Sequence, residues 1–145
     1  MRTYHSDDFE AIEEIYNLSK LDELRFEDKQ FRLLPLQLDD KRFRGLMESQ
    51  IVVFDNGSIL GYGAFHGSEI SALFVHPSAR GKGIGANLLQ HLLGLVAEPA
   101  KLYVAKSNRP AKSLYTRYGF EITDEFVTSY NDTPVLANEM TRLSV

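Results

Sequence analysis

The chain has 145 residues, of which 43% are hydrophobic and 25% are charged, and a net charge of −4. This size and composition predict one soluble domain over residues 1–145, and the negative charge argues against nucleic acid or an anionic membrane as a partner. No Cys is present and the four His show no metal-ligand spacing, so no disulfide, cysteine nucleophile or metal is expected. Neither a membrane-length apolar run nor a signal-peptide pattern occurs, so we expect a cytoplasmic protein.

The first half of the chain predicts one clear helix and a β-hairpin. Ser6 or Asp7 caps a helix with an apolar stripe. Residues 21–48 mix helical periodicity with a proline break, and predict one or two short helices with loops. Strands are expected at 51–54 and 58–65, because an Asp-Asn-Gly hairpin turn separates them.

The middle of the chain predicts a strand–helix–strand unit. Residues 69–75 form an apolar strand that ends at a His-Pro pair. Residues 84–97 form an amphipathic, leucine-rich helix, which Pro99 stops. A helical crossover joins the first strand to the next one, at 102–106, so these two strands are predicted to be parallel.

The last part of the chain predicts one helix and two strands. The helix starts at Asn108, with a Pro near its first position, and ends before Gly119. Strands follow at about 120–130 and 135–143. The predicted fold class is therefore α+β, with antiparallel hairpins, one βαβ unit and helices on both faces of a mixed sheet.

A glycine-rich loop is the most informative feature of the sequence. The run Arg80-Gly81-Lys82-Gly83-Ile84-Gly85 lies between the strand at 69–75 and the helix that follows. Glycine is a poor helix former, so three glycines at a helix start suggest that backbone must approach a ligand closely. Free N–H groups and the helix dipole at this end favour phosphate oxygens. The loop is interpreted as a cradle for the pyrophosphate of a nucleotide-like cofactor.

Two other interpretations of this loop were weighed. The spacing of Gly81, Gly83 and Ala86 also fits a loose dinucleotide-binding fingerprint. Such a unit begins near the start of its domain and is followed by a strand that ends in an acid, whereas here several elements precede it and the next strand ends in Lys-Ser-Asn. A purely structural glycine turn is the other alternative.

The loop and a second block together resemble the GNAT superfamily of acyl-CoA-dependent N-acetyltransferases. Arg80-x-x-Gly83-x-Gly85 matches the family signature Q/R-x-x-G-x-G/A, and residues 72–77 are similar to its L-x-V-x-P entry strand. Residues 111–120, AKSLYTRYGF, resemble its A-x-x-L-Y-x-x-x-G-F block. The resemblance spans residues 69–120, in the family's order and spacing.

The resemblance implies a GNAT-like, mostly antiparallel sheet in which the central parallel strands splay apart. Acetyl-CoA would be the co-substrate, with its pyrophosphate on the loop amides, its pantetheine arm along the strand backbone and Asn108 beside that arm. The cofactor-binding residues implied are Leu73, Phe74, Val75, Arg80, Gly81, Lys82, Gly83, Ile84, Gly85 and Asn108.

Two catalytic residues are predicted. Tyr115 corresponds to the family's tyrosine, which would protonate the departing thiolate, although its helical spacing also fits a core residue. Glu69 is the predicted base, because its interval to Arg80 resembles that of the catalytic glutamate in histone-type members. We expect it at the open end of the splayed pair, although an exposed turn acid is the alternative. His66 or a water chain could replace Glu69, and the N–H of Val75 is the oxyanion donor that the resemblance implies.

The predicted function is N-acetylation of a primary amine by direct attack on the thioester of acetyl-CoA. The rivals are a non-catalytic acyl-CoA-binding or sensor domain and a dinucleotide-binding oxidoreductase. Segments at about 24–38 and 125–136 are expected to build the acceptor pocket. The acceptor is a small-molecule amine or a peptide or protein amine, and both the acyl preference beyond acetyl and a homodimeric state are left open.

Overall fold

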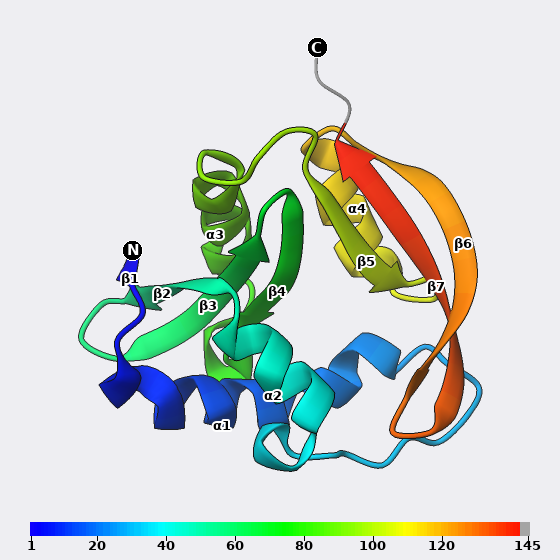
Figure 1. Cartoon of the computed structure of the whole chain (residues 1–145), viewed down its shortest axis with the longest axis horizontal. Helices are drawn as coiled ribbons and strands as arrows, with labels where there is room; N and C mark the ends of the chain where they lie inside the picture. Colours follow the sequence, from blue (N-terminus) through cyan, green and yellow to red (C-terminus); the bar gives the residue numbers. More distant parts are fainter. Residues whose placement is uncertain (143–145) are drawn as a thin grey trace.

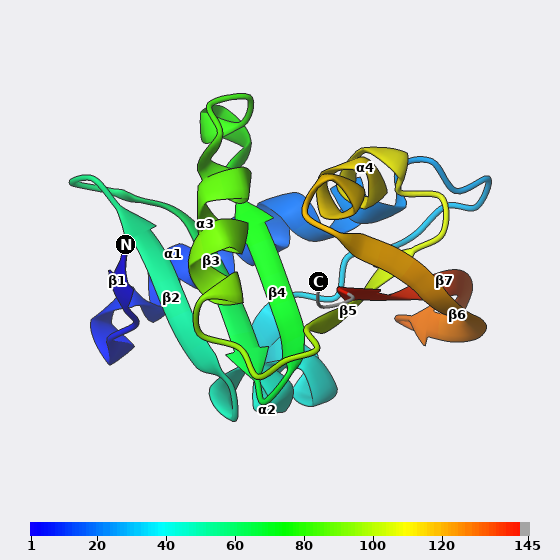
Figure 2. The same cartoon turned by 90° about the horizontal axis from the view of Figure 1, so that it is seen from above.

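The computed structural model describes residues 1–142. Within this range the chain forms a seven-stranded mixed sheet with the order β1-β2-β3-β4-β5-β7-β6 (Figures 1 and 2). The strands are β1 (Arg2–Thr3), β2 (Gln50–Asp55), β3 (Ile59–His66), β4 (Glu69–Val75), β5 (Lys101–Ala105), β6 (Phe120–Tyr130) and β7 (Thr133–Arg142). The α-helices are α1 (Phe9–Ser19), α2 (Asp40–Met47), α3 (Ile84–Leu93) and α4 (Arg109–Arg117), and the 3₁₀ turns are η1 (Ser6–Asp8), η2 (Lys20–Leu24), η3 (Leu36–Leu38) and η4 (Pro77–Ala79).

The centre of the sheet is open. β4 and β5 run parallel, but they pair only at Glu69–Lys101 and Ile70–Leu102. Beyond these two pairs the strands separate, and Figure 1 shows β5 leaning away from β4 toward β7. The predicted α+β class and the splayed parallel pair are therefore confirmed.

A β-bulge marks the point where the two strands part. Phe65 on β3 lies opposite Ile70, and Ala64 lies opposite Ala72, so Ser71 is an extra residue on β4. A bulge of this kind bends its strand and increases the local twist. The bend lies directly after the last residue of β4 that pairs with β5, so it accounts for the splay.

The two faces of the sheet carry separate cores. α1 and α2 cover one face, where the buried residues are Ile12, Ile15, Tyr16, Leu36, Leu46, Ile51, Val53, Tyr62, Ala64 and Phe74. α3 and α4 cover the other face, where the buried residues are Val52, Phe65, Ile70, Leu89, Leu92, Val96, Ala100, Leu102, Val104, Phe120 and Met140. Both layers converge on β4, so β4 is held from two sides while its edge toward β5 is left open.

The structure departs from the predicted elements by more than one or two residues in two places. β1 was not predicted, because a two-residue strand has no periodicity. Arg2 of this strand forms ion pairs with Asp8 and Asp55, which hold β1 beside β2. α3 ends at Leu93 rather than at 97, because the chain turns at Gly94. Position 143 of the last predicted strand lies outside the described residues. No helix within residues 1–142 has both the length and the apolar character to cross a membrane.

Candidate active site

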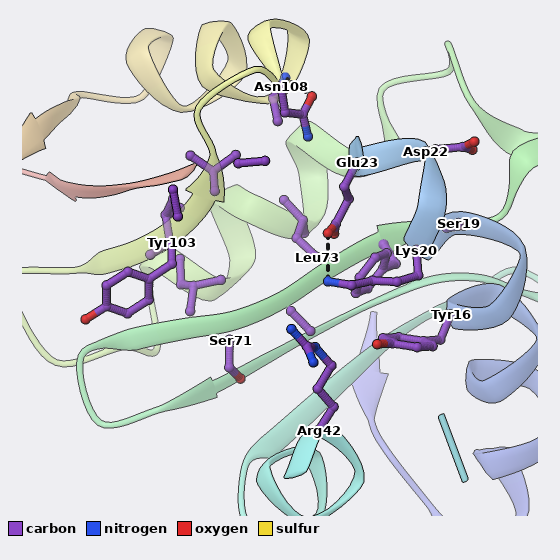
Figure 3. Close-up of a pocket in the computed structure, with 18 of the residues that line it drawn as sticks. Tyr16, Ser19, Lys20, Asp22, Glu23, Arg42, Ser71, Leu73, Tyr103 and Asn108 are labelled. Carbon is purple, nitrogen blue, oxygen red and sulfur yellow. Dashed lines mark hydrogen bonds and ion pairs between the residues drawn. The ribbon is translucent and has the colours of Figure 1, made fainter. Parts of the chain in front are cut away.

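A cleft of about 1280 Å³ passes through the opening between β4 and β5. It begins at the glycine loop and continues to the side of the sheet that α1 and α2 cover. Figure 3 shows its middle part, where Leu73 of β4 lies between Asn108 on one side and side chains of α1, η2 and α2 on the other. The cleft therefore connects the two faces of the sheet.

The glycine loop has the geometry of an anion site. Gly81 and Gly83 have φ angles of 78° and 81°, a conformation that L side chains rarely adopt. A Cβ at either position would meet no protein atom within 4 Å, and both residues line the cleft. Gly83 is the N-cap of α3 and offers no side-chain cap, so N–H groups of the first helical turn remain for a ligand. The loop thus fits a phosphate group.

The open edge of β4 offers backbone hydrogen-bonding groups to the cleft. The N–H of His76 donates to the carbonyl of Leu60 on β3, over 2.8 Å. Because backbone groups alternate in direction along a strand, those of Phe74 also point to β3, whereas those of Leu73 and Val75 point toward β5. β5 has already separated there, so an extended ligand can add to β4 as a strand would.

Arg80 and Lys82 have different positions in the loop. The guanidinium of Arg80 forms an ion pair with Asp22 of η2, and its Nε donates to the Val75 carbonyl over 3.4 Å. Ser19 Oγ donates to the same carbonyl over 3.3 Å. Arg80 thus joins η2 to the end of β4 at the cleft wall, whereas Lys82 is exposed and does not line the cleft.

Asn108 and Tyr115 both reach the cleft from α4. Asn108 is buried and its Oδ1 accepts a hydrogen bond from the Ala111 N–H over 3.5 Å, as an N-cap. This leaves its Nδ2 group for the cleft. The ring of Tyr115 packs edge-on against Phe120, with the centroids 5.9 Å apart. Its hydroxyl forms no hydrogen bond to another described residue. Tyr115 therefore packs against the core through its ring and also lines the cleft.

The environment of Tyr115 keeps its hydroxyl protonated. Burial raises the pKa of Tyr115 well above its ordinary value of 10.0, and the negative charge of Glu23 raises it further. The same carboxylate also contributes to the raised pKa values of Tyr16, Tyr62 and Tyr130. Glu23 was not predicted as a site residue, yet it lines the cleft, where Figure 3 shows its side chain reaching toward Lys20.

Glu69 lies at the opposite end of the opening from the one predicted. It pairs with Lys101 of β5 and with His66 of β3, so it is at the closed end of the splayed pair. The expectation that the start of β4 is the open end is wrong, because the bulge at Ser71 opens the strands only after this point. Glu69 and His66 nevertheless line the cleft, on the far side of the bulge from the glycine loop.

The wall opposite the glycine loop agrees with the predicted one only in part. Phe31 and Leu34 of the predicted segment pack into a small core with Leu24 and Tyr130, and Phe26 is exposed outside the cleft. The wall comes from α1, η2 and α2 and from the β6–β7 hairpin, so it includes Leu24, Arg25 and Leu36 of the first predicted segment and part of the second, 125–136. Five polar residues of this wall were not predicted from the sequence: Tyr16, Ser19, Lys20, Glu23 and Arg42. Within residues 1–142, no three His, Asp or Glu side chains group in a way that could hold a metal ion.

The sheet is opened between two parallel strands and has a glycine-rich loop beside the opening, so it has room for an extended, phosphate-bearing ligand between its strands. The model of the Acetyltransferase (GNAT) family matches residues 9–120. The chain belongs to this family, which confirms the resemblance found in the sequence.

Known relatives agree with this assignment. YjaB of Salmonella typhimurium, a peptidyl-lysine N-acetyltransferase, is 34% identical over 73 residues, which are 50% of this chain and 50% of YjaB. The chain thus spans half the length, or less, of the curated relatives it matches.

Solved structures share the fold. A GCN5-related N-acetyltransferase of Rhodopseudomonas palustris superposes with a TM-score of 0.78 at 19% identity, over 97% of this chain and 92% of the other. A phosphinothricin acetyltransferase of Sinorhizobium meliloti, solved with acetyl-CoA, gives 0.72 at 22% identity, over 97% and 85%. At these identities the likeness shows the fold alone.

Proposed function

We propose that this chain is an acetyl-CoA-dependent N-acetyltransferase that acts on a primary amine. The observation that carries the proposal is the continuous cleft, which joins a phosphate-fitting loop to a tyrosine hydroxyl and then to a polar wall on the other face of the sheet. Two substrates can therefore enter from opposite faces and meet beside β4. The family and the fold support the acetyl donor.

The residues that would hold acetyl-CoA are those of the loop and of the β4 edge. The N–H groups of residues 81–85 would bind the pyrophosphate, and the backbone of Leu73 and Val75 would bind the pantetheine arm. Asn108 would donate to the same arm through Nδ2. When bound, acetyl-CoA would supply the activated acetyl group, and the N–H of Val75 would stabilise negative charge on the carbonyl oxygen, as the resemblance implies.

Proton transfer would use Tyr115 and a carboxylate. The amine attacks the thioester carbonyl, the C–S bond breaks, and the Tyr115 hydroxyl protonates the leaving sulfur. Glu69 is the base to which the resemblance points. Glu23 is the carboxylate whose charge acts on Tyr115. Both line the cleft, and substitution of each distinguishes them.

A non-catalytic acyl-CoA-binding domain is the second candidate, since it would keep the loop and the β4 edge. The oxyanion donor and the tyrosine would then serve no reaction. The dinucleotide-binding alternative is dropped, because the sheet has one parallel pair and the family is now known.

An acetylation assay tests the proposal directly. The purified chain is incubated with acetyl-CoA and a panel of free amino acids, polyamines and lysine peptides, and free CoA thiol is measured. The chain has no Cys, so the protein adds no thiol background. We expect amine-dependent thiol release that Gly83→Asp abolishes. If acetyl-CoA stabilises the protein while no amine releases thiol, the non-catalytic candidate is the correct one.

A further inference from the structure

One buried hydroxyl in the cleft wall has no partner. Tyr16 of α1 is 4% exposed, and its hydroxyl oxygen is buried without a hydrogen bond to any described residue. An unpaired buried polar group is destabilising, so such groups in folded proteins call for an explanation. Burial raises the pKa of Tyr16 far above its ordinary value, and the hydroxyl therefore remains an O–H donor.

Two cations converge on the same place. Lys20 Nζ lies 6.0 Å from the centre of the Tyr16 ring and 5.3 Å from that of the Tyr130 ring. The guanidinium of Arg42 lies 4.9 Å from the centre of the Tyr130 ring. Figure 3 shows Tyr16, Lys20 and Arg42 pointing toward one another, below β4 and beside Ser71.

Neighbouring acids fix both cations without using all of their donors. Lys20 Nζ pairs with Glu23 over 2.9 Å, and Arg42 Nη1 pairs with the buried Asp39 over 3.1 Å. An ammonium has three donors and a guanidinium has five, so most remain free. The positive charge of Arg42 opposes the rise in the pKa of Tyr16. Figure 3 shows the Arg42 side chain on the same side of β4 as the Tyr16 hydroxyl.

We propose that Tyr16, Lys20 and Arg42 form a subsite for an anionic oxygen group on the acceptor, so that the preferred acceptor is a small amine that also carries a carboxylate. Every free group in the cluster is a donor, and a carboxylate is an acceptor only, with two oxygens to receive them. The inference rests on the proposed function for the amine end, which lies toward Glu23 and Tyr115 in the same cleft.

The proposal explains why Tyr16 keeps a buried, unpaired hydroxyl. A ligand oxygen would accept a hydrogen bond from this hydroxyl. The hydroxyl therefore destabilises the free protein and stabilises the complex. Tyr16→Phe removes only this oxygen. We therefore expect Tyr16→Phe to melt at a higher temperature than wild type without ligand, and to respond less to the acceptor.

Matched acceptors provide the test. Amino acids with different distances between amine and carboxylate are each compared with their own carboxamide, by kcat/KM for acetylation and by thermal shift of the protein. We expect at least one acid to be preferred over its amide by about 10-fold or more, as for a charge-assisted hydrogen bond. Arg42→Gln and Tyr16→Phe should reduce this preference and leave the KM of acetyl-CoA unchanged.

The controls are Arg44→Gln, on the same helix but outside the cleft, and Tyr4→Phe, which is also outside it. Equal rates for acids and amides would overturn the subsite and leave the acetyltransferase proposal standing. If no amine reacts, the thermal shift still decides, because the subsite requires the acids to stabilise wild type more than Arg42→Gln. The absence of that difference also overturns the subsite, as does a lower melting temperature of free Tyr16→Phe.

Discussion

Replacing Gly83 should separate cofactor binding from folding. Gly83 has a positive φ of 81°, and a Cβ there would point into the cleft without touching the protein. Gly83→Asp therefore has two effects. It strains the backbone of the free protein by about 1 kcal/mol, as an L residue in this region does. It also places a carboxylate where the pyrophosphate of acetyl-CoA would bind, and like charges repel.

The expected sizes of these two effects differ. At 100 times its dissociation constant, acetyl-CoA stabilises wild type by about 2.7 kcal/mol, which for a chain of this length corresponds to a rise in Tm of roughly 5–10 °C. If Gly83→Asp weakens binding 100-fold, the same ligand concentration gives about 0.4 kcal/mol. The cofactor-dependent shift then falls to roughly 1 °C, while the ligand-free Tm falls by only a few degrees.

Two variants serve as controls in the same thermal-shift titration. Gly57→Asp introduces the same residue at another positive φ, 108°, in the β2–β3 turn away from the cleft, so its cofactor shift should equal that of wild type. Gly85→Ala should bind normally, because its Cβ would lie 3.7 Å from Val75 Cγ2, an ordinary contact, and the family signature accepts Ala there. A folded Gly83→Asp protein with the wild-type shift would refute the loop as the pyrophosphate site.

Two predictions concern proton transfer. Tyr115→Phe should lower kcat about 100-fold with acetyl-CoA affinity unchanged, whereas Tyr118→Phe, outside the cleft, should not. Because the pKa of Tyr115 is raised above 10.0, the hydroxyl stays protonated at pH 10, so the kcat profile of wild type should show no tyrosine-dependent fall between pH 8 and 10. A decline centred on pH 10 would contradict a buried tyrosine acid. Glu69→Gln and Glu23→Gln identify the base. The variant that lacks the base should lose kcat/KM near pH 7 and recover part of it at high pH, where more of the amine is neutral. If the pH–rate profiles of both variants overlay that of wild type, neither carboxylate is the base, and His66 or a water chain accepts the proton.

The sequence predicted the glycine loop and α4 better than the opposite wall of the cleft, for a physical reason. Phosphate binding at the loop needs consecutive residues, so the glycines and the helix start can be recognised in a short run. The stripe of Ala111, Leu114, Tyr115 and Tyr118 is likewise local, and these residues pack against the core as their spacing predicted.

The opposite wall, proposed as the acceptor side, is formed by residues that are distant in sequence. Lys20 follows α1, Arg42 lies on α2, and Tyr130 ends β6; each alone is typical of a solvated charge or an ordinary core aromatic. Tyr16 lies on the predicted apolar face of the first helix, and it is buried there. The missing partner of its hydroxyl can be recognised only once the neighbouring elements are in place, because hydrogen bonding depends on tertiary contacts.

The bulge at Ser71 links the fold to the chemistry. Without it, Ile70, Ala72 and Phe74 would share one face of β4, because side chains alternate. With it, Ile70 and Leu73 pack toward α3, and Ala72 and Phe74 pack toward α1. The same extra residue ends the pairing with β5. This leaves the backbone of Leu73 and the N–H of Val75 without a partner strand at the centre of the sheet, while the Val75 carbonyl accepts hydrogen bonds from Ser19 and Arg80. Such an edge is a liability in a protein unless something covers it. A ligand that adds as a strand would satisfy those groups, so one inserted residue creates an edge at which such a ligand can bind.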